Sequence, residues 1–363
     1  MKIIDRYILK KYFTTFFFAI FLFTVIAIAV DVSEKTDDFV KSGLSASQVI
    51  QQYYIAFVPY IIALLFPLFV FISVIFFTSK LAGNSEVIAI IAGGSSYNRF
   101  LRPFLWGGIT LGLILLLMVN FIIPRANDVR TRFEAVYVNP NSSYDPLLPV
   151  NHSIYFRIDS FTYAGIRNYD TATKIGTVFF MNRIKGQQLV YNLRADNIRW
   201  DTATNKWVLQ NAFERTINGL KESITTTRKK TMNFNFQPFD LSRDDYAKDK
   251  LATPQLAAFI QLEELRGSEN VNALKIERYR RLATPLAVVI LTLIGAIIAS
   301  KRARGGSGVH LAIGFVLAAI FILMDRFSTI FSTKGNLPPE IAAWIPDFVF
   351  IIVAYILYKK AAK

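Results

Sequence analysis

Apolar runs long enough to cross a bilayer constrain this 363-residue chain more than any other feature. A membrane-spanning helix needs roughly 20 consecutive, mostly apolar residues. Five runs meet this criterion clearly: Tyr12–Val30, Ile55–Phe77, Phe104–Ile123, Ala283–Ser300 and Val309–Ile330. A sixth candidate, Glu340 to Tyr358, is weaker because it contains Pro346 and Asp347. We count it because Trp344 and Tyr358 mark its two interfaces. We predict an integral membrane α-helical bundle with about six transmembrane helices.

Composition supports this class and excludes others. Apolar residues make up 53% of the chain and charged residues 18%, whereas a soluble domain is about a quarter charged. The chain has no cysteine and only two histidines, His152 and His310, so we expect neither a thiolate site nor a zinc site. The net charge of +15 is spread over span ends and the middle region without a nucleic-acid-binding motif, so we expect no nucleic acid partner.

Lysine and arginine in the short loops give the orientation. The tail before the first span, every second loop and the last residues are basic, whereas the loop from Asp31 to Tyr54 is acidic. Because positive loops stay in the cytoplasm, we predict that both termini are cytoplasmic and that the large middle region is periplasmic. Ala27-Ile28-Ala29 also matches a signal-peptidase pattern, but the preceding stretch is longer and more aromatic than a signal peptide requires, so we expect a retained helix.

The middle region, residues 124–252, changes to a two-residue period with turn signals, which predicts an inserted periplasmic all-β domain. A jelly roll, an antiparallel sandwich and an open barrel all fit, and its apolar face suits either a core or a lipid-binding groove. The expected strands are 152–159, 175–185, 187–194, 197–201, 206–216, 222–227 and 232–237. Residues 253–281 return to a helical period and form a predicted helical connector that ends in Arg278, Arg280 and Arg281. The first three spans thus occupy residues 1–123 and the last three 282–363.

The loop after the second span holds a candidate short helix near 84–94. Asn84 or Ser85 can cap its start, Glu86 suits the positive end of its dipole, and Val87 and Ile90 recur at helical spacing. One interpretation is an amphipathic helix lying on the bilayer. The alternative is a coupling helix that docks into a cytoplasmic ATPase.

The chain has no P-loop and no hydrolase motif, so we expect no enzyme activity and no cofactor of its own.

Motifs along nearly the whole chain resemble the lipopolysaccharide-export permeases of the LptF/LptG type. They include Asp5-Arg6-Tyr7-Ile8, Val30-Asp31, Phe66-Pro67, Ser85-Glu86-Val87, Ala92-Gly93, Asp325-Arg326-Phe327, Leu337-Pro338-Pro339 and Trp344-Ile345-Pro346. The first, second and sixth of these look more like the G-type subunit. The resemblance implies six spans with a jelly-roll domain after the third.

The resemblance also implies partners. Two such permeases pair in the bacterial inner membrane above a cytoplasmic ABC ATPase dimer that binds ATP and Mg²⁺, and a periplasmic bridge protein receives the lipopolysaccharide. Asn84, Ser85, Glu86, Val87 and Ile90 would contact the ATPase. Outward-facing cations can pair with lipid phosphates, and the candidates are Lys35, Lys41, Arg130, Arg132, Arg278 and Arg326. Some relatives carry a lysine late in the first span, where this chain has Ile28.

Two alternatives remain open from the sequence. Another ABC-type lipid or lipoprotein exporter is one, although such subunits usually have four spans with the external domain after the first. A membrane-anchored scaffold that transports nothing is the other. Secondary transport fits less well, because the spans hold few charges and no inverted repeat is visible.

Overall fold

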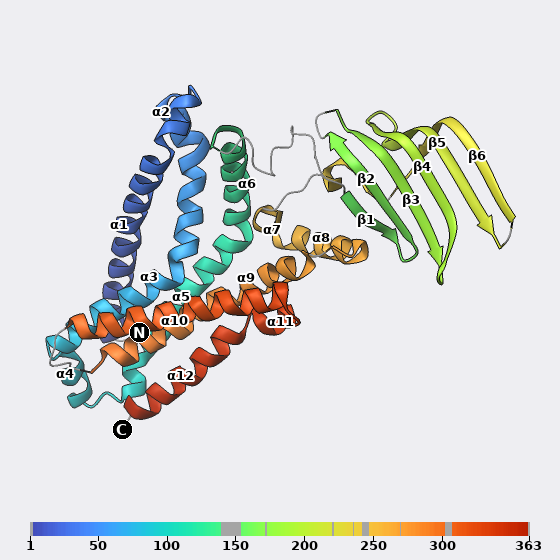
Figure 1. Ribbon diagram of the computed structural model, residues 1–363. Helices are drawn as coiled ribbons and strands as arrows, with labels where there is room; N and C mark the ends of the chain where they lie inside the picture. Colours follow the sequence, from blue (N-terminus) through green and yellow to red (C-terminus); the bar gives the residue numbers. More distant parts are fainter. Residues whose placement is uncertain are drawn as a thin grey trace. The chain divides into compact units, whose positions relative to one another are not determined.

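The computed structural model describes residues 3–138, 154–170, 173–219, 221–234, 236–241, 247–268, 270–301 and 307–361. These residues form two compact units (Figure 1). The helical unit contains the described residues up to 138, residues 248–256 and residues 272–361. The β unit contains the described residues from 154 to 247 and residues 257–271.

Within the described residues, six helices are long and apolar enough to cross a membrane, which confirms the predicted number. Two of them contain π-helical turns, labelled η. The spans are α1 (Ile3–Lys41), α2–η1–α3 (Ala46–Val49, Ile50–Tyr54, Ile55–Gly83), α5–η2–α6–η3 (Tyr97–Leu117, Met118–Ile122, Ile123–Phe133, Glu134–Val138), α9 (Val271–Ala299), α10 (Ser307–Lys334) and α11–α12 (Pro339–Ala342, Ile345–Ala361). The shorter helices are α4 (Glu86–Ala92), α7 (Ala247–Lys250) and α8 (Thr253–Arg266).

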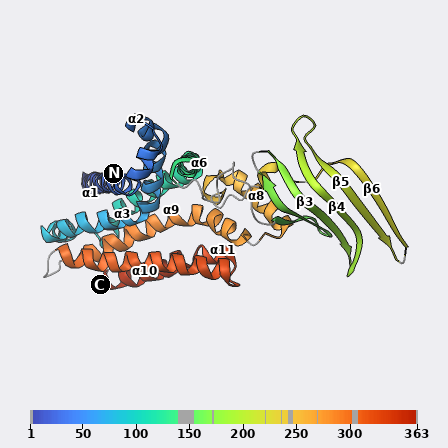
Figure 2. The same cartoon turned by 45° about the horizontal axis from the view of Figure 1, so that its top comes forward.

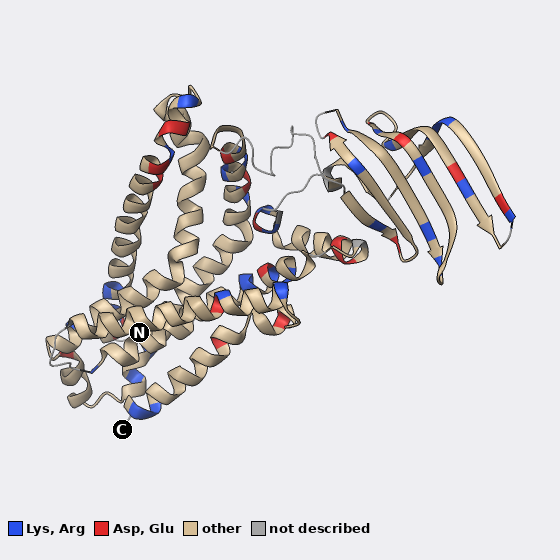
Figure 3. Ribbon diagram, viewed as in Figure 1, with Lys and Arg blue, Asp and Glu red and all other residues tan. Residues whose placement is uncertain are grey.

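The helices extend beyond the apolar runs that revealed them. The predicted acidic loop from Asp31 to Tyr54 is mostly helical, because α1 continues to Lys41 and the next helix starts at Ala46. Residues 124–138, expected to begin the β domain, are helical as well. The sequence prediction was wrong at both places for the same reason: hydropathy detects the part of a helix that lipid solvates, and it cannot see polar turns that continue the helix. In Figure 3 the charged residues of these spans gather toward the helix ends.

Aromatic rings and glycines pack the centre of the helical unit. Phe77 of α3 stacks between Tyr12 of α1 and Phe104 of α5, with centroid distances of 5.7 and 5.5 Å. The buried Tyr12 hydroxyl lies 2.8 Å from Thr292 Oγ1 of α9, so it forms a hydrogen bond inside the bundle. Gly107 of α5 faces the Tyr12 ring, where a Cβ atom would lie 2.5 Å from it. Small residues thus allow α5 to approach its neighbours closely.

The β unit is one antiparallel sheet of six strands in chain order, which confirms the inserted all-β domain (Figures 1 and 2). The strands are β1 (Ile154–Asp159), β2 (Thr162–Asp170), β3 (Ile175–Lys185), β4 (Gln188–Asp201), β5 (Lys206–Asn218) and β6 (Lys221–Met232). Their order is that of a meander, in which each strand pairs with the next one along the chain. The sequence missed β2 and divided β4 into two strands, and His152 lies outside the described residues.

One face of the sheet carries its core. Phe179, Leu193 and Trp207 are buried there, and the chain after β6 returns across this face. The Trp207 indole N–H donates to the Phe236 carbonyl at 2.8 Å, and the Phe236 ring contacts Phe156 of β1. The apolar face is therefore covered by the protein's own residues at these strands, as expected for a core.

Candidate functional site

Helix α4 follows a sharp turn at Asn84 and Ser85. Ser85 occupies the position before the helix with φ 61°, a left-handed conformation, and its side chain makes no capping hydrogen bond. The predicted cap by Ser85 is therefore wrong. The Asn84 side-chain amide instead donates to Glu86 Oε1 at 3.3 Å, and the helix ends at Ala92, directly before Gly93 and Gly94.

Glu86 connects α4 to the start of α1. The Tyr7 hydroxyl donates to Glu86 Oε2 at 2.8 Å, and the Lys11 ammonium lies 3.8 Å from Glu86 Oε1. Partial burial opposes the charge of Glu86, but the hydrogen bonds from Tyr7 and Asn84 and the charge of Lys11 outweigh it and lower the pKa of Glu86. A second contact, from Arg99 to Asp5 at 2.7 Å, joins α5 to the same end of α1.

The two apolar faces of α4 differ in what they contact. Val87 is buried in the core of the helical unit and Ile90 packs against that core. Ile88 and Ile91 are 54% and 40% exposed, so they form the free apolar surface of α4. The sequence named Val87 and Ile90 for partner contact, whereas the exposed pair is Ile88 and Ile91. Both pairs have helical spacing, so periodicity alone does not decide which face points inward.

Two predicted lipid-binding cations lie in an ion-pair cluster where α1, η1, α6 and η3 meet. The Lys35 ammonium is 2.9 Å from Asp31 and 3.0 Å from Glu134, and it also contacts the Tyr53 hydroxyl. Arg130 donates to both oxygens of Glu134 at 3.0 and 2.8 Å, and its guanidinium covers the ring of Tyr60. Lys35 and Arg130 are thus partnered within the protein.

The other predicted cations are placed separately. Arg132 forms an exposed pair with Asp128 of its own helix at 2.9 Å. Lys41 and Arg278 are exposed, and neither has an ion pair or hydrogen bond among the described residues. Arg326 on α10 is also exposed and unpaired within the described part of the chain, and it lines a pocket of the helical unit. Ile28 is half-buried against the apolar cluster that includes Tyr53 and Phe57.

The three arginines at the start of α9 have separate environments. Arg278 faces outward, and Arg280 pairs with Asp325 of α10 at 2.6 Å. The Arg281 side chain is only 3% exposed, and it donates to Thr253 Oγ1 at 3.0 Å and to the Lys248 carbonyl at 2.9 Å. The segment from Lys248 in α7 to Thr253 in α8 is therefore anchored on α9 inside the helical unit.

Asp249 lies in this anchored segment. Burial raises its pKa to about 6, and the negative charge of Glu277 adds to this effect, while Lys248, Arg130 and Arg281 oppose it. The backbone carbonyl of Asp249 accepts from the Asn127 amide at 3.1 Å. This carboxyl therefore titrates near neutral pH, where an exposed aspartate would be fully ionised.

Comparison with known proteins agrees with this architecture. No curated protein matches the chain. The family model described as lipopolysaccharide export system permease LptF/LptG matches residues 6–360, which include all six spans and the β unit. This model covers F- and G-type subunits together, so the G-type assignment stays a prediction. The chain therefore belongs to the LptF/LptG family of lipopolysaccharide export permeases and is a multi-pass inner-membrane protein.

Proposed function

We propose that this chain is one of two permease subunits of an ABC transporter that extracts lipopolysaccharide from the inner membrane. The lipid then passes through the periplasmic β unit toward a bridge protein and the outer membrane. A separate pair of cytoplasmic ATPases binds and hydrolyses ATP, so this chain is not itself catalytic. Both termini and α4 lie in the cytoplasm in this proposal, as the basic loops predict.

The family match over residues 6–360 carries the proposal, and the uneven burial of the spans supports it. In their most apolar windows, 67% of α9 but only 11% of α1 and 17% of α10 is buried within the chain. Large apolar faces need lipid or another protein against them. We infer that α1 and α10 line the space shared by two permeases, where acyl chains are received.

Contacts at α4 suggest how an ATPase acts on this space. Ile88 and Ile91 offer an apolar docking surface, while Glu86 holds Tyr7 of α1. Arg99 holds Asp5 on the same end of α1. A docked ATPase that moves α4 therefore pulls on α1 directly, as well as on the neighbouring ends of α3 and α5.

A lipid phosphate can pair with a lysine or arginine side chain that has no carboxylate partner or that gives its partner up. Lys41 and Arg278 are unpaired among the described residues, so we propose them as the first contacts. Arg326 is also unpaired there, but it lines a pocket of the helical unit and is not one of these contacts. Lys35, Arg130 and Arg132 remain candidates only if a phosphate displaces the carboxylate that each now holds.

Reconstitution tests the proposal. The chain is placed in proteoliposomes with its co-purified permease, ATPase and bridge protein, and transfer of labelled lipopolysaccharide to the soluble bridge protein is measured. We expect transfer that requires ATP. Hydrolysis of ATP without lipid transfer would favour the scaffold alternative.

A charge reversal tests the docking step. We expect Glu86→Arg to abolish co-purification of the ATPase while membrane insertion stays normal. Glu34→Arg, an equal change at an exposed position of α1, is the matched control and should leave co-purification unchanged. Normal ATPase yield with Glu86→Arg would refute the role of α4.

A further inference from the structure

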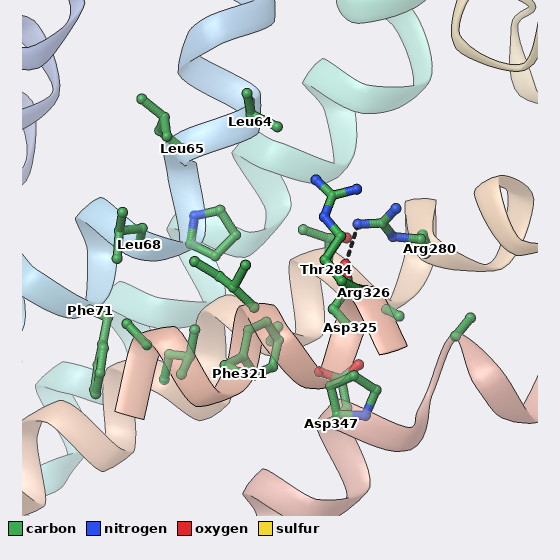
Figure 4. Close-up of a pocket in the computed structure, with 18 residues that line it drawn as sticks. Leu64, Leu65, Leu68, Phe71, Arg280, Thr284, Phe321, Asp325, Arg326 and Asp347 are labelled. Atoms are coloured by element: carbon green, nitrogen blue, oxygen red, sulfur yellow. Dashed lines mark hydrogen bonds and ion pairs between the residues drawn. The ribbon is translucent and has the colours of Figure 1, made fainter. Parts of the chain in front are cut away.

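The helical unit contains a pocket with a volume of about 290 Å³, lined by α3, α9, α10 and the start of α12 (Figure 4). Ligand pockets are usually apolar with a few polar groups, and the smallest have volumes of about 300 Å³. Figure 4 shows Arg280, Asp325, Arg326 and Asp347 together at one end of this pocket. Leu65, Leu68 and Phe71 lie toward the other end, so the pocket is amphipathic.

Two ionisable side chains at the polar end, Arg326 and Asp347, lack an ion-pair or hydrogen-bond partner for at least one polar atom among the described residues. Arg280 and Asp325 neutralise one another at 2.6 Å. Asp347 is only 3% exposed, and its buried Oδ2 atom has no hydrogen-bond partner in the part of the chain that the structure describes. Arg326 forms no ion pair or hydrogen bond among the described residues. A buried carboxylate oxygen without a partner is costly, so a ligand that satisfies it binds favourably.

The position of this pocket suits an amphiphile. α12 begins at its polar end, Arg280 lies in the first half of α9, and Asp325 and Arg326 lie in the last third of α10. Its polar residues therefore lie toward one end of three spans, where we expect lipid head groups, and the apolar wall continues along the spans. A ligand entering from the bilayer can keep its head group at this end and its acyl chain against Leu68 and Phe71.

We propose that this pocket binds a zwitterionic phospholipid whose head group carries a phosphate and a primary ammonium. The phosphate pairs with Arg326 and the ammonium donates to Asp347 Oδ2, while one acyl chain occupies the apolar part. An anionic head group without an amine leaves Asp347 unsatisfied, and a simple amine leaves Arg326 unpaired. This membrane lipid differs from the exported cargo, and the inference does not depend on the transport reaction.

Three single-chain probes with hydrocarbon chains of equal length separate the contribution of the phosphate from that of the ammonium. Lysophosphatidylethanolamine carries both groups, lysophosphatidic acid lacks the ammonium, and an alkylammonium lacks the phosphate. Binding to the full chain in detergent is measured by native mass spectrometry. We expect the zwitterion to bind roughly tenfold more tightly than either other probe, the effect of one hydrogen bond to a charged group. Equal binding of all three probes overturns the proposal.

Variants assign each contact. Asp347→Asn should remove the preference over lysophosphatidic acid, and Arg326→Gln should remove the preference over the alkylammonium. Arg125→Gln, at an exposed arginine of α6 outside the pocket lining, is the control and should change neither preference. If a variant fails to fold, the probe series on the unmodified chain still decides. Retention of both preferences in the two folded variants refutes the assigned contacts.

Discussion

At the scale of single residues, the ion-pair cluster around Glu134 shows that a cation's sequence position does not define its role. Glu134 accepts from Lys35 and Arg130 together, and the Tyr53 hydroxyl lies 3.1 Å from the same carboxylate oxygen as Lys35. Both cations were predicted to bind lipid. In the structure they join α1 to the last turns of the third span.

Removal of the shared carboxylate should destabilise the protein. We expect Glu134→Gln to lower the free energy of unfolding by about 2 kcal/mol, because Arg130 loses its carboxylate partner and Lys35 loses one of its two. Asp128→Asn, which breaks the exposed pair with Arg132, should cost less than about 1 kcal/mol. Thermal unfolding in detergent measures both, and equal losses would contradict a stabilising role for the cluster.

Asp249 makes a pH-dependent contribution. Its pKa in the folded state, about 6, is higher than the usual aspartate value of 3.8. The fold therefore favours the protonated form, and the stability it contributes is present below pH 3.8 and is lost as the pH rises through 6. We expect Asp249→Asn to have no effect on stability near pH 3.5 and to stabilise the protein by roughly 1–3 kcal/mol above pH 7.

Thermal unfolding of both proteins between pH 3.5 and 8 checks the Asp249 prediction. A difference between them that is constant across this range would show that Asp249 does not titrate near 6.

At the scale of elements, α4 illustrates a choice that periodicity leaves open. Val87 and Ile90 form one apolar face and Ile88 and Ile91 the other, and only packing against α3 and α5 selects the buried one. Each face therefore has a separate role that substitution can distinguish.

A matched pair of substitutions on α4 should give opposite results. Ile88→Asp should weaken ATPase co-purification by at least about tenfold and leave the yield of folded chain unchanged, because Ile88 is exposed. Val87→Asp should reduce the folded yield itself, because it buries a charge in the core. Co-purification and size-exclusion yield measure the two effects. Loss of folded yield from Ile88→Asp would reverse the assignment of faces.

The packing of α5 on α9 depends on glycine. A Cβ atom at Gly112 would lie 2.8 Å from the carbonyl oxygen of Pro285, which is backbone and cannot rotate away. We expect Gly112→Ala to destabilise the helical unit by roughly 1–3 kcal/mol. Gly83→Ala is the control, since nothing lies within 4 Å of that position. Unchanged thermal unfolding for Gly112→Ala would show that the helices can separate without loss.

At the scale of the whole molecule, the exposed apolar faces of α1 and α10 predict a protein neighbour. Phe21 and Ile320 are 68% and 43% exposed. Ile352 of α12 is 58% exposed and serves as a comparison. We expect a photo-crosslinking amino acid at Phe21 or Ile320 to capture a second permease in native membranes, and one at Ile352 to capture none. Mass spectrometry of the products identifies the neighbour, and equal capture from Ile352 would contradict the proposed interface.

The sequence by itself determined the number of spans, the all-β character of the middle region and the family. Apolar runs, two-residue alternation and ordered motifs are local properties, and each helix or strand needs only its own residues to display them. The sequence predicted the ends of the helices less accurately than it predicted their number. Polar turns such as residues 31–41 and 124–138 carry no hydropathy signal, although they continue the helices.

Only the tertiary structure decided which side chains meet. Lys35 and Glu134 are 99 residues apart in the chain, and Tyr7 and Glu86 are 79 apart. The unsatisfied oxygen of Asp347 becomes visible only when four helices enclose it. The physical reason is that ion pairs and cavities depend on distances between elements. Packing fixes these distances through contacts that no local pattern contains.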